Sequence, residues 1–185
     1  MSGCVFTGCL KMELVFEPVS PDDVEGMDKW LSQFDLAEFM TGWVPRTVRA
    51  GNWRPELCRW DVIVIEGRRV GAVWIERERV GDRTADLGIL IAEPEFRRIG
   101  IGTQVLRTIH EWSCQCWGTE TIRLRVRATN LPAVACYKKN GYRIMRASTR
   151  CMTDSSYDVL HMERDLRDPA TSKSEQDTEA DRRHR

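Results

Sequence analysis

Polar and apolar residues follow two different periods along this chain. Residues 121–129 alternate strictly, with Ile122, Leu124 and Val126 on one face and arginines on the other, which predicts a half-buried strand. In residues 103–117 the large apolar residues recur at spacings of three and four, which predicts a helix with a broad buried face. Gly118 is expected to end that helix.

Similar patterns predict the remaining elements. Strands are expected at 13–19, 60–65, 69–76, 85–92, 142–149 and 157–163, and helices at 20–34 and 132–139. The short connection 66–68 indicates a β-hairpin, and the apolar run 85–92 indicates a strand covered on both faces. Residues 35–57 contain a short helical stretch and a loop rich in Trp, Gly and Pro, which either anchors the fold or contacts a ligand. The expected fold class is α/β (α+β).

The two ends of the chain differ from the middle. Residues 168–185 contain no large apolar side chain and are expected to form a disordered polar tail, while 1–12 form an N-terminal extension. Residues 13–167 then form one domain. We expect neither a signal peptide nor a transmembrane helix, because the N-terminus lacks a charged start and no apolar run is long enough.

Composition narrows the classes of function. Lysine plus arginine and aspartate plus glutamate each number 28, so the chain lacks the basic excess of a nucleic-acid-binding protein. The seven cysteines are scattered without CxxC pairs, which favours free thiols in a reducing compartment and a cytoplasmic location. Cys114 and Cys116 would point to different faces of a helix, and no metal site is expected.

A glycine-containing turn between a strand and a helix is the most informative segment. Gly100 and Gly102 follow Arg97 and Arg98, so backbone N–H groups, a helix N-terminus and two cations converge where a pyrophosphate could bind. The turn lacks a Gly-Lys-Ser/Thr ending, and Val105 stands where a dinucleotide fold has its third glycine, so neither ATP nor NAD is favoured. A plain helix-capping loop is the alternative interpretation.

Two blocks of residues resemble the GCN5-related N-acetyltransferases. Arg97-x-x-Gly100-x-Gly102 is similar to the Arg/Gln-x-x-Gly-x-Gly/Ala signature of that family, preceded by Ala92-x-Pro94 where the family usually has Val-x-Pro. Asn130-x-x-Ala133, followed by Tyr137 and Gly141-Tyr142, resembles the second block of the family. The resemblance covers about residues 13–164. It implies a mixed central sheet of about six to seven strands flanked by helices, with strands four and five splayed apart.

The resemblance also implies a cosubstrate, acetyl-CoA, and the residues that bind it. The pantetheine arm would pair with strand four at 90–92, the pyrophosphate would lie on the turn, and Asn130 would reach the pantetheine or acetyl group. The alternative role of Asn130 is to cap the following helix. The implied cofactor-binding residues are Leu90, Ile91, Ala92, Arg97, Arg98, Ile99, Gly100, Ile101, Gly102, Thr103 and Asn130.

Acetyl transfer to an amine requires an acid, a base and a donor to the thioester oxygen. Tyr137 matches the family tyrosine that protonates the departing thiolate, although a buried aromatic would look the same. The N–H of Ala92 is the expected donor to the thioester oxygen. Arg125 stands where some ribosomal-protein acetyltransferases have a glutamate, so Asp86 on strand four is the candidate base, and a solvated carboxylate is the alternative. Glu66, Glu76 and Glu78 are reserve bases.

The resulting hypothesis is an N-acetyltransferase whose primary-amine acceptor attacks acetyl-CoA directly. The acceptor would be a small molecule such as an aminoglycoside-like antibiotic or a polyamine, or a protein N-terminus. A second copy of the chain is a further candidate partner, whereas nucleic acid and membranes are not. A non-catalytic acyl-CoA-binding regulatory module is the alternative function. The row Arg123, Arg125 and Arg127 forms either a solvated strand face or a surface that attracts an acidic acceptor.

Overall fold

A computed structural model of the 185-residue chain describes residues 13–20, 23, 44–51, 53–151 and 156–168. Its strands are β1 (Leu14–Pro18), β2 (Cys58–Ile65), β3 (Arg68–Glu76), β4 (Thr84–Ile91), β5 (Thr121–Arg127), β6 (Arg143–Cys151) and β7 (Ser156–Asp165). Its helices are α3 (Arg46–Arg49), the 3₁₀ helix η1 (Pro94–Phe96), α4 (Ile101–Trp117) and α5 (Leu131–Lys139). Apart from Ser20 and Asp23, the predicted helix at 20–34 lies outside the described residues, as do the short helical stretch at 36–40, the N-terminal extension and most of the polar tail.

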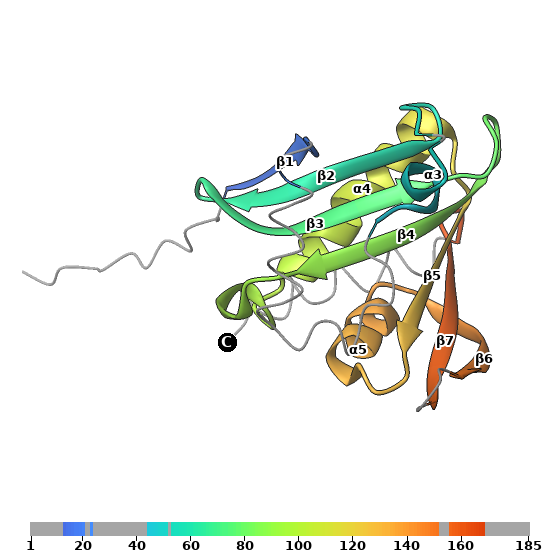
Figure 1. The fold of residues 1–185 in the computed structure, drawn as a ribbon. Helices are drawn as coiled ribbons and strands as arrows, with labels where there is room; N and C mark the ends of the chain where they lie inside the picture. Colours follow the sequence, from blue (N-terminus) through green and yellow to red (C-terminus); the bar gives the residue numbers. More distant parts are fainter. Residues whose placement is uncertain (1–12, 21–22, 24–43, 52, 152–155, 169–185) are drawn as a thin grey trace, which may run out of the picture.

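The seven strands form one mixed sheet in the order β1-β2-β3-β4-β5-β7-β6 (Figure 1). β4 and β5 pair in parallel, and the other neighbouring strands pair antiparallel. The predicted hairpin β2–β3 is confirmed, with Arg68 in the strand rather than in the turn. Its turn residues Glu66 and Gly67 have φ of 49° and 74°, as the favoured two-residue hairpin turn requires.

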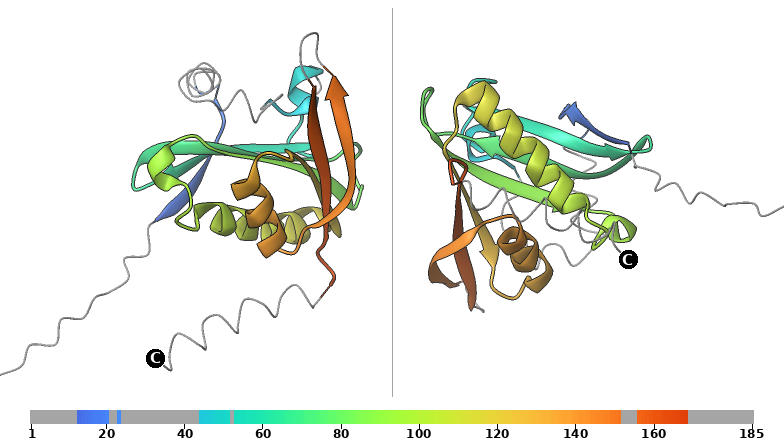
Figure 2. Two further views of the ribbon diagram at one scale, coloured as in Figure 1. Left: turned by 90° about the horizontal axis from the view of Figure 1, so that it is seen from below. Right: turned by 180° about the vertical axis from the view of Figure 1, so that it is seen from behind.

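Helix α4 covers one face of the sheet and closes the main core (Figure 2). Its apolar stripe, including Val105, Leu106 and Ile109, packs against the inward side chains of β3, β4 and β5, as its period predicts. Gly118 ends the helix with φ 64°, in agreement with the sequence. A smaller cluster on the opposite face packs Val48 of α3 against the β2–β3 hairpin. We name that opposite side, which bears Trp74, Asp86 and Arg123, the Asp86 face.

Strands β4 and β5 pair over a short distance and then separate. The pairs are Thr84 with Thr121, Ala85 with Ile122 and Asp86 with Arg123. Beyond Asp86 the two strands diverge, and α5 lies beside the gap (Figure 1). This gap between the separated parts of β4 and β5 is called the V below. The predicted mixed sheet with splayed strands four and five is therefore confirmed.

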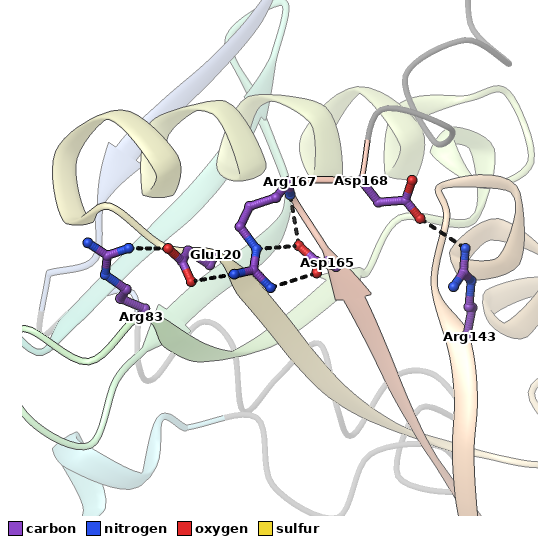
Figure 3. A network of polar contacts seen from close by, with 6 residues as sticks. All are labelled: Arg83, Glu120, Arg143, Asp165, Arg167 and Asp168. Carbon is purple, nitrogen blue, oxygen red and sulfur yellow. Dashed lines mark hydrogen bonds and ion pairs between the residues drawn. The ribbon is translucent and has the colours of Figure 1, made fainter.

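The closed end of the V is held by backbone bonds and an ion-pair network (Figure 3). Glu120 binds Arg83 on one side and Arg167 on the other, and Arg167 also binds Asp165 at 2.9 Å. The backbone N–H of Glu120 donates to the carbonyl of Arg83 over 2.8 Å. Exposed ion pairs contribute little individually, so the backbone hydrogen bonds are the main link between the strands at this end. At the opposite end, beyond Asp86 and Arg123, β4 and β5 are not paired.

Two details differ from the sequence-based expectations. The strand at 85–92 was expected to be covered on both faces, but the Asp86 side chain on β4 is 37% exposed. Residues 46–49 form the helical turn α3 within a segment expected to be a loop.

Of the cysteines that the structure describes, all five are free, as expected. Among the described residues, no helix has both the length and the apolar character to cross a membrane.

Candidate active site

The turn before α4 has the backbone shape of an anion-binding loop. Arg98 has φ 63° and Gly100 has φ 95°, so two residues around Ile99 adopt left-handed conformations. Helix α4 begins at Ile101, two residues before the predicted start, and the N–H groups of Thr103 and Gln104 both donate to the carbonyl of Gly100. The N–H groups that precede these donors are at the positive end of the helix. The turn can therefore accept a phosphate group.

Arg97 connects this turn to the end of β4. Its Nε donates to the carbonyl of Ile91 over 2.9 Å, and its Nη2 donates to the carbonyl of Ala92 over 2.5 Å. Partial burial lowers the pKa of Arg97 from its ordinary value. Arg98, by contrast, is exposed beside the turn. The two adjacent arginines thus differ, because Arg97 fixes the turn while Arg98 can meet a ligand.

Along β4, the backbone N–H groups of alternate residues point toward the V. The N–H of Ala92 donates to the carbonyl of Val70 over 2.8 Å, so the prediction of Ala92 as a free donor is wrong. In an antiparallel ladder this direction alternates, so Leu90 also faces β3, while Ile89 and Ile91 face the opposite side. Ile89 and Ile91 therefore direct their N–H groups toward the V. Of the three residues expected to pair with pantetheine, Ile91 alone has this orientation.

Helix α5 holds Asn130 and Tyr137 beside the V. The Asn130 side chain accepts a hydrogen bond from the N–H of Ala133 over 3.3 Å, so its helix-capping role is confirmed. Tyr137 is buried, and its ring packs edge-on against Tyr142 with 5.6 Å between centroids. Burial, and then the nearby Cys136, raise the pKa of Tyr137 well above its ordinary value. Its phenol therefore keeps its proton at neutral pH.

Asp86 lies at the last paired position before the V opens. Arg123 donates to it from Nε over 3.1 Å and from Nη2 over 3.4 Å. Arg46 of α3 approaches the same carboxylate at 4.0 Å. Asp86 is thus a carboxylate held between two arginines at the narrow end of the V, and its partial exposure leaves it open to solvent.

Glu76 is the residue that brings Arg46 to this position. It is buried on β3 opposite Asp86, and it accepts the N–H groups of Arg46 at 3.1 Å and Thr47 at 3.0 Å. The sequence predicts Glu76 only as a reserve base. An acidic residue directly after the apolar run 70–75 was the available signal, because buried carboxylates require hydrogen-bond donors. Its donors come from a segment that the pattern could not place.

Trp74 borders the V on the same face. A methyl group on Gly88 of β4 would lie 1.9 Å from the Trp74 ring, so the glycine allows the indole to lie directly over the strand. Trp74 is partly exposed. An aromatic ring therefore lies over β4 on the Asp86 face, at Gly88, two residues along the strand from Asp86.

A buried polar network links the turn to the far side of α4. Arg164 of β7 donates to Nδ1 of His110 at 3.0 Å and to the carbonyl of Asn140 at 2.8 Å. Nε2 of His110 contacts the Tyr142 hydroxyl at 2.7 Å, and Asn140 donates to the Thr103 hydroxyl at 3.2 Å. Because Nδ1 accepts from Arg164, the neutral ring carries its proton on Nε2. His110 is therefore a buried member of this hydrogen-bond network.

The comparisons with known proteins agree with this geometry. A sequence model described as "Acetyltransferase (GNAT) family" matches residues 24–142. The chain belongs to this family. An N-alpha-acetyltransferase from Sulfolobus acidocaldarius is 39% identical over 57 residues, which cover 31% of this chain and 33% of that protein. The chain thus spans about a third of the length of the curated relative it matches.

Solved structures match over most of the chain. The spermidine N-acetyltransferase from Vibrio cholerae, in complex with CoA and spermine, has a TM-score of 0.69 at 15% identity and covers 83% of this chain and 96% of its own. A GNAT-family acetyltransferase from Streptococcus pneumoniae has a TM-score of 0.64 at 22% identity and covers 82% and 98%. At these identities the likeness shows a shared fold. Among the described residues, no group of three His, Cys, Asp or Glu side chains is placed to hold a metal ion.

Proposed function

We propose that this protein is an N-acetyltransferase that transfers the acetyl group of acetyl-CoA to a primary amine. The observation that carries the proposal is the V between β4 and β5, which opens beside an anion-binding turn and a buried tyrosine. Family membership and the name of the archaeal relative support the same activity. The V supplies an unpaired strand edge, to which an extended arm of the cosubstrate can hydrogen-bond. The turn supplies N–H donors for its phosphate groups.

The residues of the turn and of β4 fit acetyl-CoA. The N–H groups of residues 98–102, which precede the first N–H bonded within the helix, and the exposed Arg98 would hold the pyrophosphate, while Arg97 fixes the turn to the end of β4. The outward backbone of Ile89 and Ile91 would pair with the pantetheine arm and donate to the thioester oxygen. Asn130 at the start of α5 would contact the pantetheine or acetyl region while it caps the helix.

The reaction would be a direct attack of the amine on the thioester. The amine nitrogen forms a bond to the carbonyl carbon, and the carbon–sulfur bond breaks. The amine proton passes to Asp86, directly or through water, and Tyr137 gives its proton to the departing thiolate. Solvent then takes the proton from Asp86 and returns one to Tyr137. Arg123 and Arg46 hold the Asp86 carboxylate in place through this cycle.

The acceptor classes are those that carry a primary amine: a small metabolite or polyamine, an aminoglycoside-like antibiotic, or a peptide N-terminus. Solved structures with this fold include a spermidine acetyltransferase, and the archaeal relative is an N-alpha-acetyltransferase. The candidate acceptor surface includes α3, Trp74 and Asp86. The alternative function is an acyl-CoA-binding module without turnover.

A CoA-release assay with the purified full chain tests the proposal. Acetyl-CoA binding is measured by calorimetry, and free thiol is then followed with a panel of polyamines, aminoglycosides, amino acids and short peptides. We expect release above the rate of spontaneous hydrolysis with at least one amine, together with the acetylated amine by mass spectrometry. Tight binding of acetyl-CoA without release across the panel would instead support the binding module.

A further inference from the structure

The Asp86 face carries an unusual concentration of arginine beyond the narrow end of the V. Residues directly opposite each other in antiparallel strands point to the same side of the sheet. On β5, β7 and β6 this side bears a set of side chains that we name the arginine cluster: Arg123, Arg125 and Arg127 of β5, and Arg146 and Arg150 of β6. The whole chain has a formal net charge of zero, so the cluster is a local feature.

The acidic side chains near this cluster, Asp86 and Glu163, both lie beside Arg123, in one row across the strands at the narrow end of the V. Asp86 pairs with Arg123 across the V, and Glu163 is the register partner of Arg123 on β7. From that row toward the open end, the described residues of β4 to β7 on this face carry no acidic side chain. The cations of the next row are therefore not neutralised by neighbouring strands.

The next row crosses three strands. Arg125 of β5 lies opposite His161 of β7, which lies opposite Arg146 of β6. Both arginines are exposed, and His161 contacts the Ser148 hydroxyl at 2.9 Å. Partial burial first, and then Arg146, Arg125 and Arg150, lower the pKa of His161. The electrostatic potential of these arginines is therefore positive at His161. An anion bound there would reduce the repulsion between the guanidinium groups.

The row is also close to the point of reaction. Arg125 lies two residues beyond Arg123, which is about 7 Å along a strand. The left panel of Figure 2 shows β6 and β7 extending past the plane of β2, β3 and β4 on the side where α3 lies. Arg46 of α3 contributes a further cation over Asp86. An acceptor whose amine reaches Asp86 would thus extend first toward Arg125 and then, across β7, toward Arg146, which is about 10 Å from Arg125 at this strand spacing.

We infer that the acceptor carries a carboxylate within a few bonds of its amine, and that Arg125 and Arg146 bind this carboxylate. This inference rests on the proposed function and specifies its substrate class. Arginine suits the role, because its planar guanidinium donates two parallel hydrogen bonds to a carboxylate. A polycation such as spermidine would meet repulsion on the same face.

The inference is tested with acceptors that differ only in charge. C-terminally amidated tetrapeptides that begin with aspartate or with asparagine are compared, so that the side chain is the sole carboxylate. Free glutamate is compared with glutaminamide, which keeps the amine but lacks both carboxylates, and spermidine is the cationic acceptor. We expect kcat/KM to be about tenfold or more higher for the acidic member of a pair, and to fall as salt rises. Preference for the acidic peptide or for free glutamate identifies the source of the carboxylate.

Variants locate the contact. Arg125→Gln and Arg146→Gln should each raise KM for the acidic acceptor by about tenfold with little change in kcat, and should leave the neutral acceptor unaffected. Arg107→Gln on α4, an exposed arginine on the opposite side of the sheet, is the matched control and should change neither. Acetyl-CoA affinity, measured in every variant, shows that the fold and the turn are intact.

The outcomes separate this inference from the proposed function. If the asparagine peptide or spermidine is acetylated as well as the aspartate peptide, the protein is an acetyltransferase but the inference is wrong. If the charge preference survives in the Arg125 and Arg146 variants, the carboxylate binds elsewhere and the inference is also wrong. If no amine of any charge releases CoA, the proposed function itself fails.

Discussion

Arg123 on β5 donates two hydrogen bonds to Asp86 on β4, 3.1 Å and 3.4 Å long, at the last position where the two strands pair. The pair therefore marks the point at which the V opens. It also orients the candidate base, because a guanidinium that contacts both carboxylate oxygens allows little rotation. Arg46 reaches the same carboxylate from α3, which Glu76 binds through the N–H groups of Arg46 and Thr47.

Asp86→Asn tests whether this carboxylate accepts the amine proton. We expect kcat/KM at pH 7 to fall by about 10²-fold or more, since a general base contributes 10²- to 10⁴-fold. At pH 9 to 10 the loss should be partly restored, because an amine with a pKa of about 10.4 then loses its proton without help. A pH profile parallel to that of the wild type would leave Asp86 as a surface carboxylate and direct attention to Glu66 or to water.

Arg123→Gln separates the position of Asp86 from its chemistry. The variant keeps the carboxylate but removes both guanidinium bonds, so kcat should fall by about tenfold or less while the pH profile retains its shape. A loss as large as that of Asp86→Asn would show that the ion pair, rather than the base alone, is required.

Tyr137→Phe tests the proton donor. The phenylalanine ring can pack against Tyr142 as the tyrosine ring does, so acetyl-CoA affinity and folding should change little. Loss of the acid should lower kcat by about 10²- to 10⁴-fold where chemistry limits the rate. A decrease of less than about threefold under single-turnover conditions would mean that water or another group protonates the thiolate.

Gly100→Glu tests the anion-binding turn, and Gly118→Glu is its matched control. Both glycines have positive φ, 95° and 64°, and a methyl group on either would meet nothing within 4 Å, so the backbone strain is comparable. We expect each variant to lose about 1 kcal/mol of folding free energy. Only Gly100→Glu should abolish acetyl-CoA binding in calorimetry, because its carboxylate repels a phosphate. Retained affinity in the folded Gly100 variant would exclude the turn as the pyrophosphate site.

His110 predicts a specific dependence of stability on pH. Burial, and then Arg164, lower its pKa from the ordinary 6.5 to about 3, so the folded state keeps the ring neutral where the unfolded state protonates it. Stability is therefore lost as the pH falls below 6.5. The free energy of unfolding should decrease by about 1.4 kcal/mol per pH unit, or about 2 kcal/mol between pH 7 and pH 5.

Urea unfolding of wild type and His110→Gln at pH 7, 6 and 5 measures this contribution. The variant is less stable at pH 7, because it disturbs the bonds to Tyr142 and Arg164, but its stability should change less with pH. Equal slopes for the two proteins would show that other groups cause the acid sensitivity.

The sequence determined the elements whose signals are local. The alternation in β5 and the three- and four-residue spacing in α4 predicted both correctly, because burial on one face follows directly from the period. The cap at Asn130 and the glycine end at Gly118 were predicted for the same reason, since each needs only its own neighbours. The family motif then predicted the splay of β4 and β5.

The tertiary structure alone decided which groups meet across the sheet. Ala92 looked like a free donor, but strand register gives its N–H to Val70 and turns Ile89 and Ile91 toward the V. Glu76 and Arg46 are 30 residues apart, and their contact depends on how α3 packs on β3. The row of Arg125, His161 and Arg146 likewise exists only because β5, β7 and β6 are neighbours. Such contacts depend on long-range register, which the period of a single strand does not contain.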